Sequence, residues 1–262
     1  MNKRYALAIA VVTAIVAGSA CSHPAPKLDP TANYFPLTPN MVWTYRVMSK
    51  SQKSTYVVTD RVIGTQYVPA LKLTGNVVEE FYDLDRAGLR PIIYLNGDGY
   101  LSRLSGLDYV DHQIKPPAWG RSEEKDFLPE HLTPDREWQN TLFPYGKLPG
   151  GFDVAQSHHS VVETGAVSVP AGNFENCIRI DTEAKYEGGA YAQQKKSLKL
   201  TYADWYAPNV GLIKTVAYQG GPTGPVMEQV ELLRFVPNDK PAAAASTDVA
   251  PPAPSAPVTA AP

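Results

Sequence analysis

Short segments in which apolar and polar residues alternate cover most of the chain between residues 42 and 236. This period-two pattern is typical of strands buried on one face, because successive side chains of a strand point to opposite faces. Clusters of Gly, Pro, Asn and Asp separate the segments and predict turns. Stretches with helical periodicity are scarce, so we expect an all-β protein with antiparallel strands and little helix. The expected strands are 42–49, 55–64, 67–73, 77–84, 88–95, 101–114, 137–143, 154–169, 174–186, 196–207, 211–219 and 226–236.

Two parts of this pattern echo each other. Leu37-Thr38-Pro39 is followed by Trp43, and Leu132-Thr133-Pro134 is followed by Trp138 at the same spacing. Later segments of the two parts also resemble each other, although the second part is longer. If the echo is a true repeat rather than chance, it predicts two similar meanders that lie side by side.

A charged, Pro-rich segment, 115–130, is predicted to be a loop between two halves, 34–114 and 129–238. We expect both halves to belong to a single β domain at 34–238, because each alone offers few strands with which to bury a core. The expected architecture is an antiparallel curved sheet or half-barrel, with two packed sheets as the alternative.

The expected core begins with the first strand, where Trp43 and Tyr45 alternate with Thr44 and Arg46. One face of this strand is therefore predicted to anchor a core and the other to meet solvent. Trp205 also alternates with polar neighbours, and we expect both tryptophans to be buried core anchors. The full set of expected core and structural residues is Trp43, Tyr45, Phe174, Cys177, Trp205, Tyr206 and Gly211.

The segment 167–180 contains a turn at 170–173 between two expected strands. Alternation after the turn places Phe174 and Asn176 on one face and Cys177 on the other. Asn176 is a misfit among apolar neighbours, which indicates a β-bulge or a sheet covered on both sides. An isolated thiol such as Cys177, without a Cys-x-x-Cys motif, is more often a small buried side chain than a reactive one.

Residues 1–20 have the layout of an export signal, in which Lys3 and Arg4 precede an uncharged apolar run at 5–17. Thirteen residues of helix span about 20 Å, whereas a bilayer core is about 30 Å thick. The run is therefore predicted to be a cleaved signal peptide rather than a membrane helix. Small residues then lead directly to Cys21, so we expect cleavage before Cys21 and lipidation of its thiol.

The signal resembles bacterial lipoprotein signals, with one departure: Gly18 stands where an aliphatic residue is usual. The alternative is an ordinary secretory signal in which Cys21 is incidental. Ser22, rather than Asp, follows the cysteine. By resemblance to lipoprotein sorting in bacteria with two membranes, this implies anchoring on the periplasmic face of the outer membrane.

Both flanks of the domain have a composition unlike that of a packed core. Residues 21–33 form a polar, Pro-containing segment that is expected to act as a lipidated tether. Residues 239–262 are rich in Ala and Pro without periodicity, which predicts a disordered tail.

Charge and cysteine content narrow the classes of partner. Loss of Lys3 and Arg4 with the signal leaves 22 basic residues against 26 acidic ones, so no basic field is available to attract nucleic acid. If Cys21 is acylated, Cys177 is the remaining thiol and no intramolecular disulfide is expected.

Three motifs together resemble a widespread group of uncharacterised bacterial envelope lipoproteins. They are Phe35-Pro36-Leu37 with Trp43-Thr44-Tyr45, then Pro170-Ala171-Gly172 with Phe174 and Cys177, then Trp205-Tyr206-Ala207-Pro208 with Val210-Gly211-Leu212. The resemblance spans residues 34–236, and Asn40 stands where the group commonly has Gly. In overall β character the group is similar to periplasmic lipoprotein carriers with a curved half-barrel, a similarity of fold alone. It implies no catalytic role for any residue.

Candidate catalytic and metal-binding residues are few. His158 and His159 are adjacent, so on a strand they point to opposite faces and are not expected to hold one metal ion. Asp108, Asp111 and His112 occur without any hydrolase motif. We therefore expect no metal, no cofactor and no enzymatic activity. Asp83 and Asp85 are read as the charged tip of a hairpin.

These observations together predict an outer-membrane-anchored periplasmic lipoprotein that acts as a non-enzymatic binding or assembly module. Its expected partner, apart from the membrane, is an apolar ligand or another envelope protein. The alternatives are a purely structural envelope protein that acts through protein contacts and a hydrolase with an unrecognised site.

Overall fold

The computed structural model describes residues 31–50, 53–83, 89–116, 122–144, 154–187 and 198–238, which form fourteen strands and, within these ranges, no helix. The prediction of an all-β protein is thus confirmed. No helix of the described residues has the length and apolar character needed to cross a membrane. The strands are β1 (Val42–Ser49), β2 (Ser54–Val68), β3 (Leu73–Tyr82), β4 (Leu89–Gly97), β5 (Tyr100–Ser105), β6 (Asp108–Val110), β7 (Gln113–Lys115), β8 (Ser122–Pro129), β9 (Glu137–Pro144), β10 (Val154–Val169), β11 (Gly172–Glu187), β12 (Leu198–Ala207), β13 (Gly211–Gln219) and β14 (Val226–Val236).

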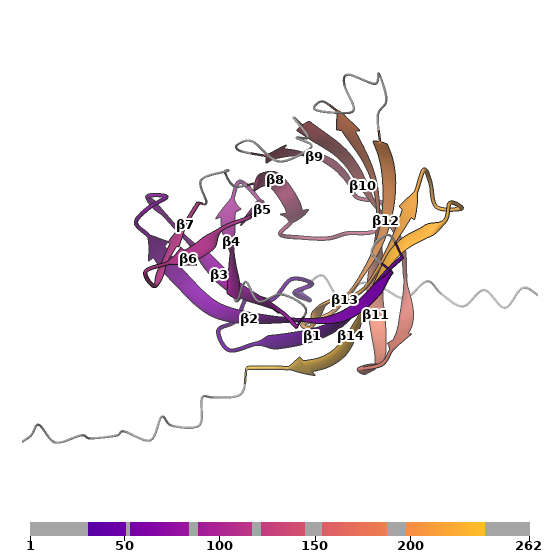
Figure 1. Cartoon of the computed structure of the whole chain (residues 1–262). Coiled ribbons are helices and arrows are strands. Elements are labelled where there is room, and N and C mark those ends of the chain that lie inside the picture. Colours follow the sequence, from indigo (N-terminus) through magenta and orange to yellow (C-terminus); the bar gives the residue numbers. More distant parts are fainter. Residues whose placement is uncertain are drawn as a thin grey trace, which may run out of the picture.

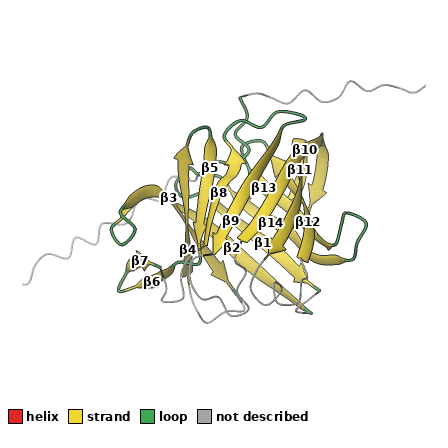
Figure 2. Ribbon diagram, turned by 90° about the horizontal axis from the view of Figure 1, so that it is seen from above, coloured by secondary structure: helices red, strands yellow, loops and turns green. Residues whose placement is uncertain are grey.

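All strands except β6 and β7 form one closed antiparallel barrel, in the order β1-β14-β13-β12-β11-β10-β9-β8-β5-β4-β3-β2 (Figures 1 and 2). The expected curved sheet or half-barrel was therefore wrong in one respect, because the sheet closes. Closure comes from β1 and β14, which pair from Val42 opposite Val236 to Ser49 opposite Glu228. Alternation within each strand carries no information about whether the first and last strands meet, so the sequence pattern could not predict this contact.

A second correction concerns the expected loop at 115–130, which contains the barrel strand β8. Half of the residues in its sequence, Ser122 to Pro129, are charged, and it does not show the apolar face that normally marks a strand. The strand forms because β5 and β9 pair with it on both sides. Polar side chains are tolerated there because one of them, Glu124, has partners inside the barrel, as described below. The expected strand 67–73 is also wrong, because these residues comprise the end of β2 and the turn that leads into β3.

Bulges adapt several strands to the barrel. In the β10–β11 hairpin the register shifts between Gly165 and Val167, and the backbone of Asn176 has a φ of 54°. The bulge predicted at Asn176 is therefore present. Apolar residues near the tip of this hairpin, including Val169 and Phe174, pack against the main hydrophobic cluster around Trp43.

The small β6–β7 hairpin lies outside the ring of strands (Figure 1). Leu107 and Ile114 from this region pack against residues on the outer side of β3, β4 and β5, such as Ile93. The hydroxyl of Tyr109 also donates a hydrogen bond to Glu79 Oε1 at 3.0 Å. The outer surface of these three strands is thus buried by the hairpin.

One end of the barrel is covered by residues 31–41, which we call the strap. Asn33 accepts a backbone hydrogen bond from Asn209 at 2.7 Å, and the Tyr34 hydroxyl donates to the carbonyl of Asn176 at 3.0 Å. Asn209 lies in the β12–β13 turn, so these contacts fix the strap to that end of the wall. Lipidation at Cys21, the signal 1–20, most of the tether 21–33 and the tail 239–262 lie outside the described residues.

Candidate ligand-binding cavity

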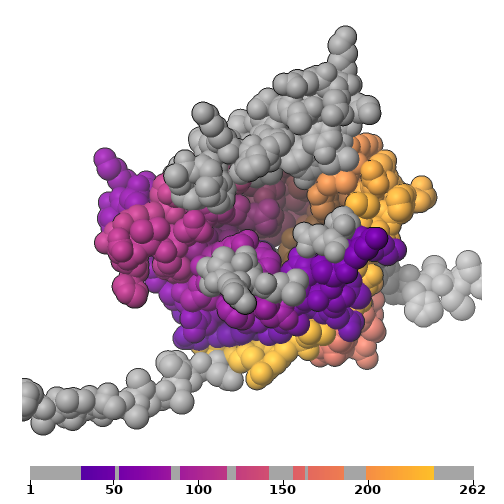
Figure 3. Space-filling view, viewed as in Figure 1, coloured from indigo at the N-terminus to yellow at the C-terminus, as the bar shows by residue number. Residues whose placement is uncertain are grey.

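The barrel encloses a cavity of about 390 Å³. In the space-filling view the molecule is hollowed in the middle of the ring of strands (Figure 3). The strap contributes Phe35, Pro36 and Leu37 to the lining, and inward-facing side chains of the strands contribute the rest. A second hollow of about 380 Å³ lies beside the strap, between it and Leu128–Leu132.

The inward face of the wall is set by strand register. Trp43 lies opposite Asp60 on β2, and Asp60 lies opposite Glu80 on β3. Because facing residues of paired strands point to the same side of a sheet, the buried Trp43 places both carboxyl groups inside. Arg103 on β5 lies opposite Glu124 on β8, so by the same rule these two side chains also point to one side of the sheet.

Asp60 and Glu80, which we call the carboxyl pair, face each other without a cation between them. The Oδ1 atom of Asp60 is buried and has no hydrogen-bond partner among the described residues. Glu80 accepts a hydrogen bond from the Tyr82 hydroxyl at 3.2 Å. Burial raises the pKa of Asp60 well above its usual value, and the charge of Glu80 raises it further. Burial also raises the pKa of Glu80, although the charges of Arg103 and Arg90 and the hydrogen bond from Tyr82 act in the opposite direction.

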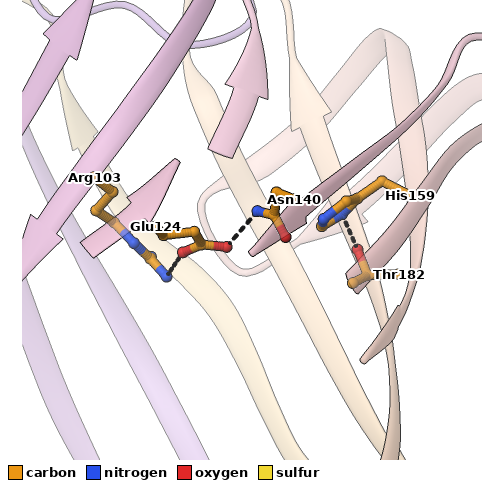
Figure 4. Close-up of polar contacts among 5 residues, drawn as sticks. All are labelled: Arg103, Glu124, Asn140, His159 and Thr182. Atoms are coloured by element: carbon orange, nitrogen blue, oxygen red, sulfur yellow. Dashed lines mark hydrogen bonds and ion pairs between the residues drawn. The ribbon is translucent and has the colours of Figure 1, made fainter. Parts of the chain in front are cut away.

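A chain of polar contacts crosses the wall from β5 to β9 (Figure 4). Arg103 donates from one terminal nitrogen to Glu124 Oε2 at 2.6 Å, and Asn140 donates to Glu124 Oε1 at 2.8 Å. The Arg103 guanidinium also lies 4.5 Å from the ring centroid of Phe127. Glu124 is thus satisfied at both oxygens, in contrast to Asp60.

His159 lies next to this chain and presents a free nitrogen (Figure 4). Its ring stacks on that of Trp138, with centroids 4.8 Å apart, and its Nδ1 shares a 2.8 Å hydrogen bond with Thr182 Oγ1. Burial lowers the pKa of His159 to about 4, so the ring is neutral at pH 7. Within the described residues, His159 Nε2, Trp138 Nε1 and Asn140 Oδ1 are buried without partners.

Asp204 on β12 supplies a further inward carboxyl group. It accepts a hydrogen bond from the Thr215 hydroxyl at 2.6 Å. Burial raises the pKa of Asp204 to about 6, although the hydrogen bond from Thr215 acts in the opposite direction. This carboxyl group is therefore poised to change its protonation state not far below neutral pH.

The end of the cavity next to the strap is aromatic. Phe35 meets Tyr94 edge-on at 5.0 Å between ring centroids, and Phe127 at 5.8 Å. Trp43 donates from its indole nitrogen to the carbonyl of Val210 at 2.6 Å, and Tyr45 donates to that of Leu212 at 3.0 Å. These hydrogen bonds fix the rings, so this end of the cavity is preformed.

Four of the residues singled out from sequence line the cavity: Trp43, Tyr45, Tyr206 and Gly211. Gly211 has a φ of 98° and lies beneath the strap, where an added Cβ would come within 3.5 Å of Pro36 Cδ. A left-handed backbone at this point of close approach requires glycine.

The other singled-out residues lie elsewhere. Cys177 is buried, its thiol hydrogen-bonds the carbonyl of Phe174 at 3.3 Å, and burial raises its pKa to about 11. Phe174 is half-buried against the main hydrophobic cluster.

Trp205 is half-buried rather than buried: it lies on the outer face of the wall and packs against the main hydrophobic cluster from there. Its neighbours in sequence, Asp204 and Tyr206, both face the cavity, so alternation turns Trp205 outward. Arg179 and Lys214 lie over its ring, at 5.8 Å and 5.1 Å from the centroid. The prediction was misled by Asp204: this polar neighbour was expected to face solvent, but it points into the cavity.

The candidates for metal and acid–base chemistry are dispersed. His158 is exposed and His159 is buried inside, as their adjacent positions predict. Asp108, Asp111 and His112 lie on the β6–β7 hairpin, the last two at its exposed turn. No group of His, Cys, Asp or Glu in the described part of the chain is arranged to hold a metal ion. Asp83 accepts a backbone hydrogen bond from Val57 at 2.9 Å; Asp85 lies outside the described residues.

Sequence reasoning missed the charged residues inside the barrel: Asp60, Glu80, Arg103, Glu124 and Asp204. A signal for one of them was present, because Asp60 stands two residues from Val58 and Val62, both buried. A charge at an inward position of an otherwise apolar alternation is a candidate site residue.

The chain resembles known proteins in fold more than in sequence. No protein-family model and no curated protein sequence matches the chain. Two solved structures resemble it at the level of the chain trace. One is a candidate lipoprotein from Parabacteroides distasonis, with a TM-score of 0.48 and 15% identity, covering 78% of this chain and 99% of its own. The other is a candidate exported protein with a YmcC-like fold from Bacteroides fragilis, with a TM-score of 0.45, 17% identity and the same coverage.

Proposed function

We propose that this protein is an envelope lipoprotein that binds a small molecule inside its barrel and does not transform it. The observation that carries the proposal is the interior cavity of about 390 Å³, whose lining includes the buried and unpartnered Trp138 Nε1 and His159 Nε2. Small-molecule sites typically measure about 300–1,000 Å³ and combine apolar walls with a few fixed polar groups.

The unpartnered atoms Trp138 Nε1 and His159 Nε2 support the proposal more strongly than the volume of the cavity does. A buried donor or acceptor without a partner costs about 1–3 kcal/mol, and native proteins leave few of them. Trp138 and His159 are adjacent on β9 and β10, so two such groups meet at one place in the wall. A bound molecule, or water held in its place, supplies the missing partners.

The proposed location follows from the N-terminal signal. Lipidation of Cys21 anchors the chain to the periplasmic face of the outer membrane, as the lipoprotein-like signal and Ser22 indicate. Nine residues lie between Cys21 and Thr31, where the described chain enters the strap. The strap end of the barrel therefore stays within reach of the membrane, since an extended chain spans at most about 3.5 Å per residue.

Native mass spectrometry of the full mature lipoprotein, released gently from detergent, tests the proposal. We expect a species heavier than the lipidated chain by the mass of one small molecule. Ala184 lines the cavity and is 2% exposed, so Ala184→Phe should fill the site and abolish the extra mass.

The matched control is Glu183→Phe, which places the same ring on the outer face of the same strand. Glu183 is exposed and forms a surface ion pair with Lys199 at 2.7 Å, which contributes little to stability. This variant should keep the extra mass. An extra mass that survives Ala184→Phe in a folded protein, or no extra mass in the wild type, would contradict the proposal and favour a purely structural role.

A further inference from the structure

The inner face of the barrel carries more acidic than basic groups. Among the described residues that line the cavity, the carboxyl groups are those of Asp60, Glu80, Glu124 and Asp204, and the basic group is that of Arg103. Arg103 is already paired with Glu124 at 2.6 Å. Arg90, which faces Glu80 from β4, is exposed and lies over the ring of Tyr82; its charge lowers the pKa of Glu80 without forming an ion pair with it.

The other three inward carboxyl groups, those of Asp60, Glu80 and Asp204, form no ion pair with a described residue. The charge of Arg103 acts on Glu80 and Asp204 from a distance and only partly offsets their burial. A buried carboxylate without a counter-charge is costly, and it either takes up a proton or acquires a cation. The unpartnered Oδ1 of Asp60 marks the place where a donor is missing. An ammonium group offers three N–H donors and a positive charge, and so meets both needs.

The aromatic end of the cavity selects the remainder of the ligand. Trp43, which lies opposite Asp60, lines the cavity together with the rings of Tyr45, Tyr94 and Tyr206. Ring faces attract cations and stack on flat apolar groups, with about 0.5–2 kcal/mol for each cation–π contact. Trp138 and His159, 6% and 7% exposed, add the unpartnered atoms Nε1 and Nε2 to the same cavity.

We infer that the ligand is an organic cation: a protonated amine carried on an aromatic or similarly flat apolar body. The ammonium group is directed to the carboxyl pair, Asp60 and Glu80, and the body to the aromatic end. This inference rests on the proposed function, because it assigns a ligand class to the same cavity.

The test is calorimetric titration of the full mature lipoprotein in neutral detergent with three probes that share an indole ring. The probes are tryptamine, which is cationic, tryptophol, which is neutral, and indole-3-acetate, which is anionic. At pH 8 we expect tryptamine to bind at least tenfold more tightly than tryptophol, a difference of about 1.4 kcal/mol. Indole-3-acetate should give no measurable binding.

Paired variants separate local charge from net charge. The inner double variant, Asp60→Asn with Glu80→Gln, should bring the affinities for tryptamine and tryptophol to within twofold of each other. The outer control, Glu79→Gln with Glu231→Gln, changes the net charge equally. Both control residues are paired with arginines on the outer face, so this variant should keep the tenfold preference.

Every result of these experiments either supports or overturns the inference of a cationic ligand. Equal affinity for tryptamine and tryptophol, with both lost in Ala184→Phe, overturns the cation but leaves the binding function standing. A preference reduced equally by the inner and outer double variants also overturns it. If no probe binds, the molecule found by mass spectrometry decides: a cation supports the inference, and a neutral or anionic molecule overturns it. No probe bound and no molecule found would overturn both proposals.

Discussion

The inner and outer faces of one barrel wall use the same kinds of side chain in different ways. Trp43 faces inward, is 6% exposed and donates its indole N–H to a backbone carbonyl. Trp205 faces outward, is half-buried and lies beneath Arg179 and Lys214. Both tryptophans alternate with polar neighbours in the sequence, but the strand register turns one into the barrel and the other to its outer face.

The charged residues differ in the same way. On the outer face Glu79, Glu231 and Glu183 are each paired with a cation at 2.6–2.7 Å. On the inner face Asp60 and Glu80 face each other instead. The outer carboxylates are thus neutralised within the wall, whereas Asp60 and Glu80 form no ion pair with a described residue, which is why we propose that they receive a cationic ligand.

The largest expected effect compares the two tryptophans. Trp43→Ala should lower the free energy of unfolding by about 3–5 kcal/mol, because it opens a void in the core and frees the carbonyl of Val210. Trp205→Ala should cost less, about 1–2 kcal/mol, because the ring packs only partly against the main hydrophobic cluster and also meets flexible cationic side chains. Urea denaturation followed by circular dichroism measures both. Equal losses of unfolding free energy in the two variants would show that the inner and outer faces of the wall are packed equally well.

The next effect compares two ion pairs of the same 2.6 Å length. Arg103→Met leaves Glu124 charged inside the barrel and should cost about 3 kcal/mol. Arg61→Met leaves Glu79 with the hydrogen bond from the Tyr109 hydroxyl, and Arg61 is itself more exposed than Arg103 (53% against 35%), so the loss should be smaller, about 1 kcal/mol. The readout is again the urea midpoint, and a similar shift for both variants would mean that surroundings do not decide the strength of these pairs.

A smaller effect appears in the pH dependence of stability between about pH 4 and pH 6. The raised pKa of Asp204, about 6, means that the folded state binds more protons than the unfolded state, so stability falls as pH rises through this window. The lowered pKa of His159, about 4, has the opposite sign, and stability rises with pH until about 6.5. The two slopes oppose each other in the wild type.

Single variants should reveal each slope. Asp204→Asn should make stability rise more steeply from pH 4 to pH 6, and His159→Gln should make it fall, each by about 2 kcal/mol across the window. Glu183→Gln, on the outer face, should change neither slope. Urea titrations at half-unit pH steps would detect this, and identical pH profiles for all three variants would refute the assignment of both groups to a buried interior.

The sequence predicted most of the wall but not its closure or its interior. Strands β1, β10, β13 and β14 fall at the expected residues, because each alternates strongly between turn clusters. Pairing between β1 and β14 depends on a contact between residues far apart in the chain, which local pattern does not encode. The polar interior also hid β8, since the pattern rules assume that the buried face is apolar, and Glu124 breaks that assumption.

The central claim is that the inner carboxyl groups receive a cation, and proton exchange on binding tests it most directly. Burial raises the pKa of Asp204 to about 6, so this carboxyl group is about half protonated at pH 6, and burial also favours the protonated form of Asp60; an entering ammonium should therefore displace protons. We would measure the binding enthalpy of tryptamine at pH 6 in two buffers with different ionisation enthalpies. The account predicts release of about half a proton or more per tryptamine and none for tryptophol. Equal enthalpies in both buffers for tryptamine would contradict it.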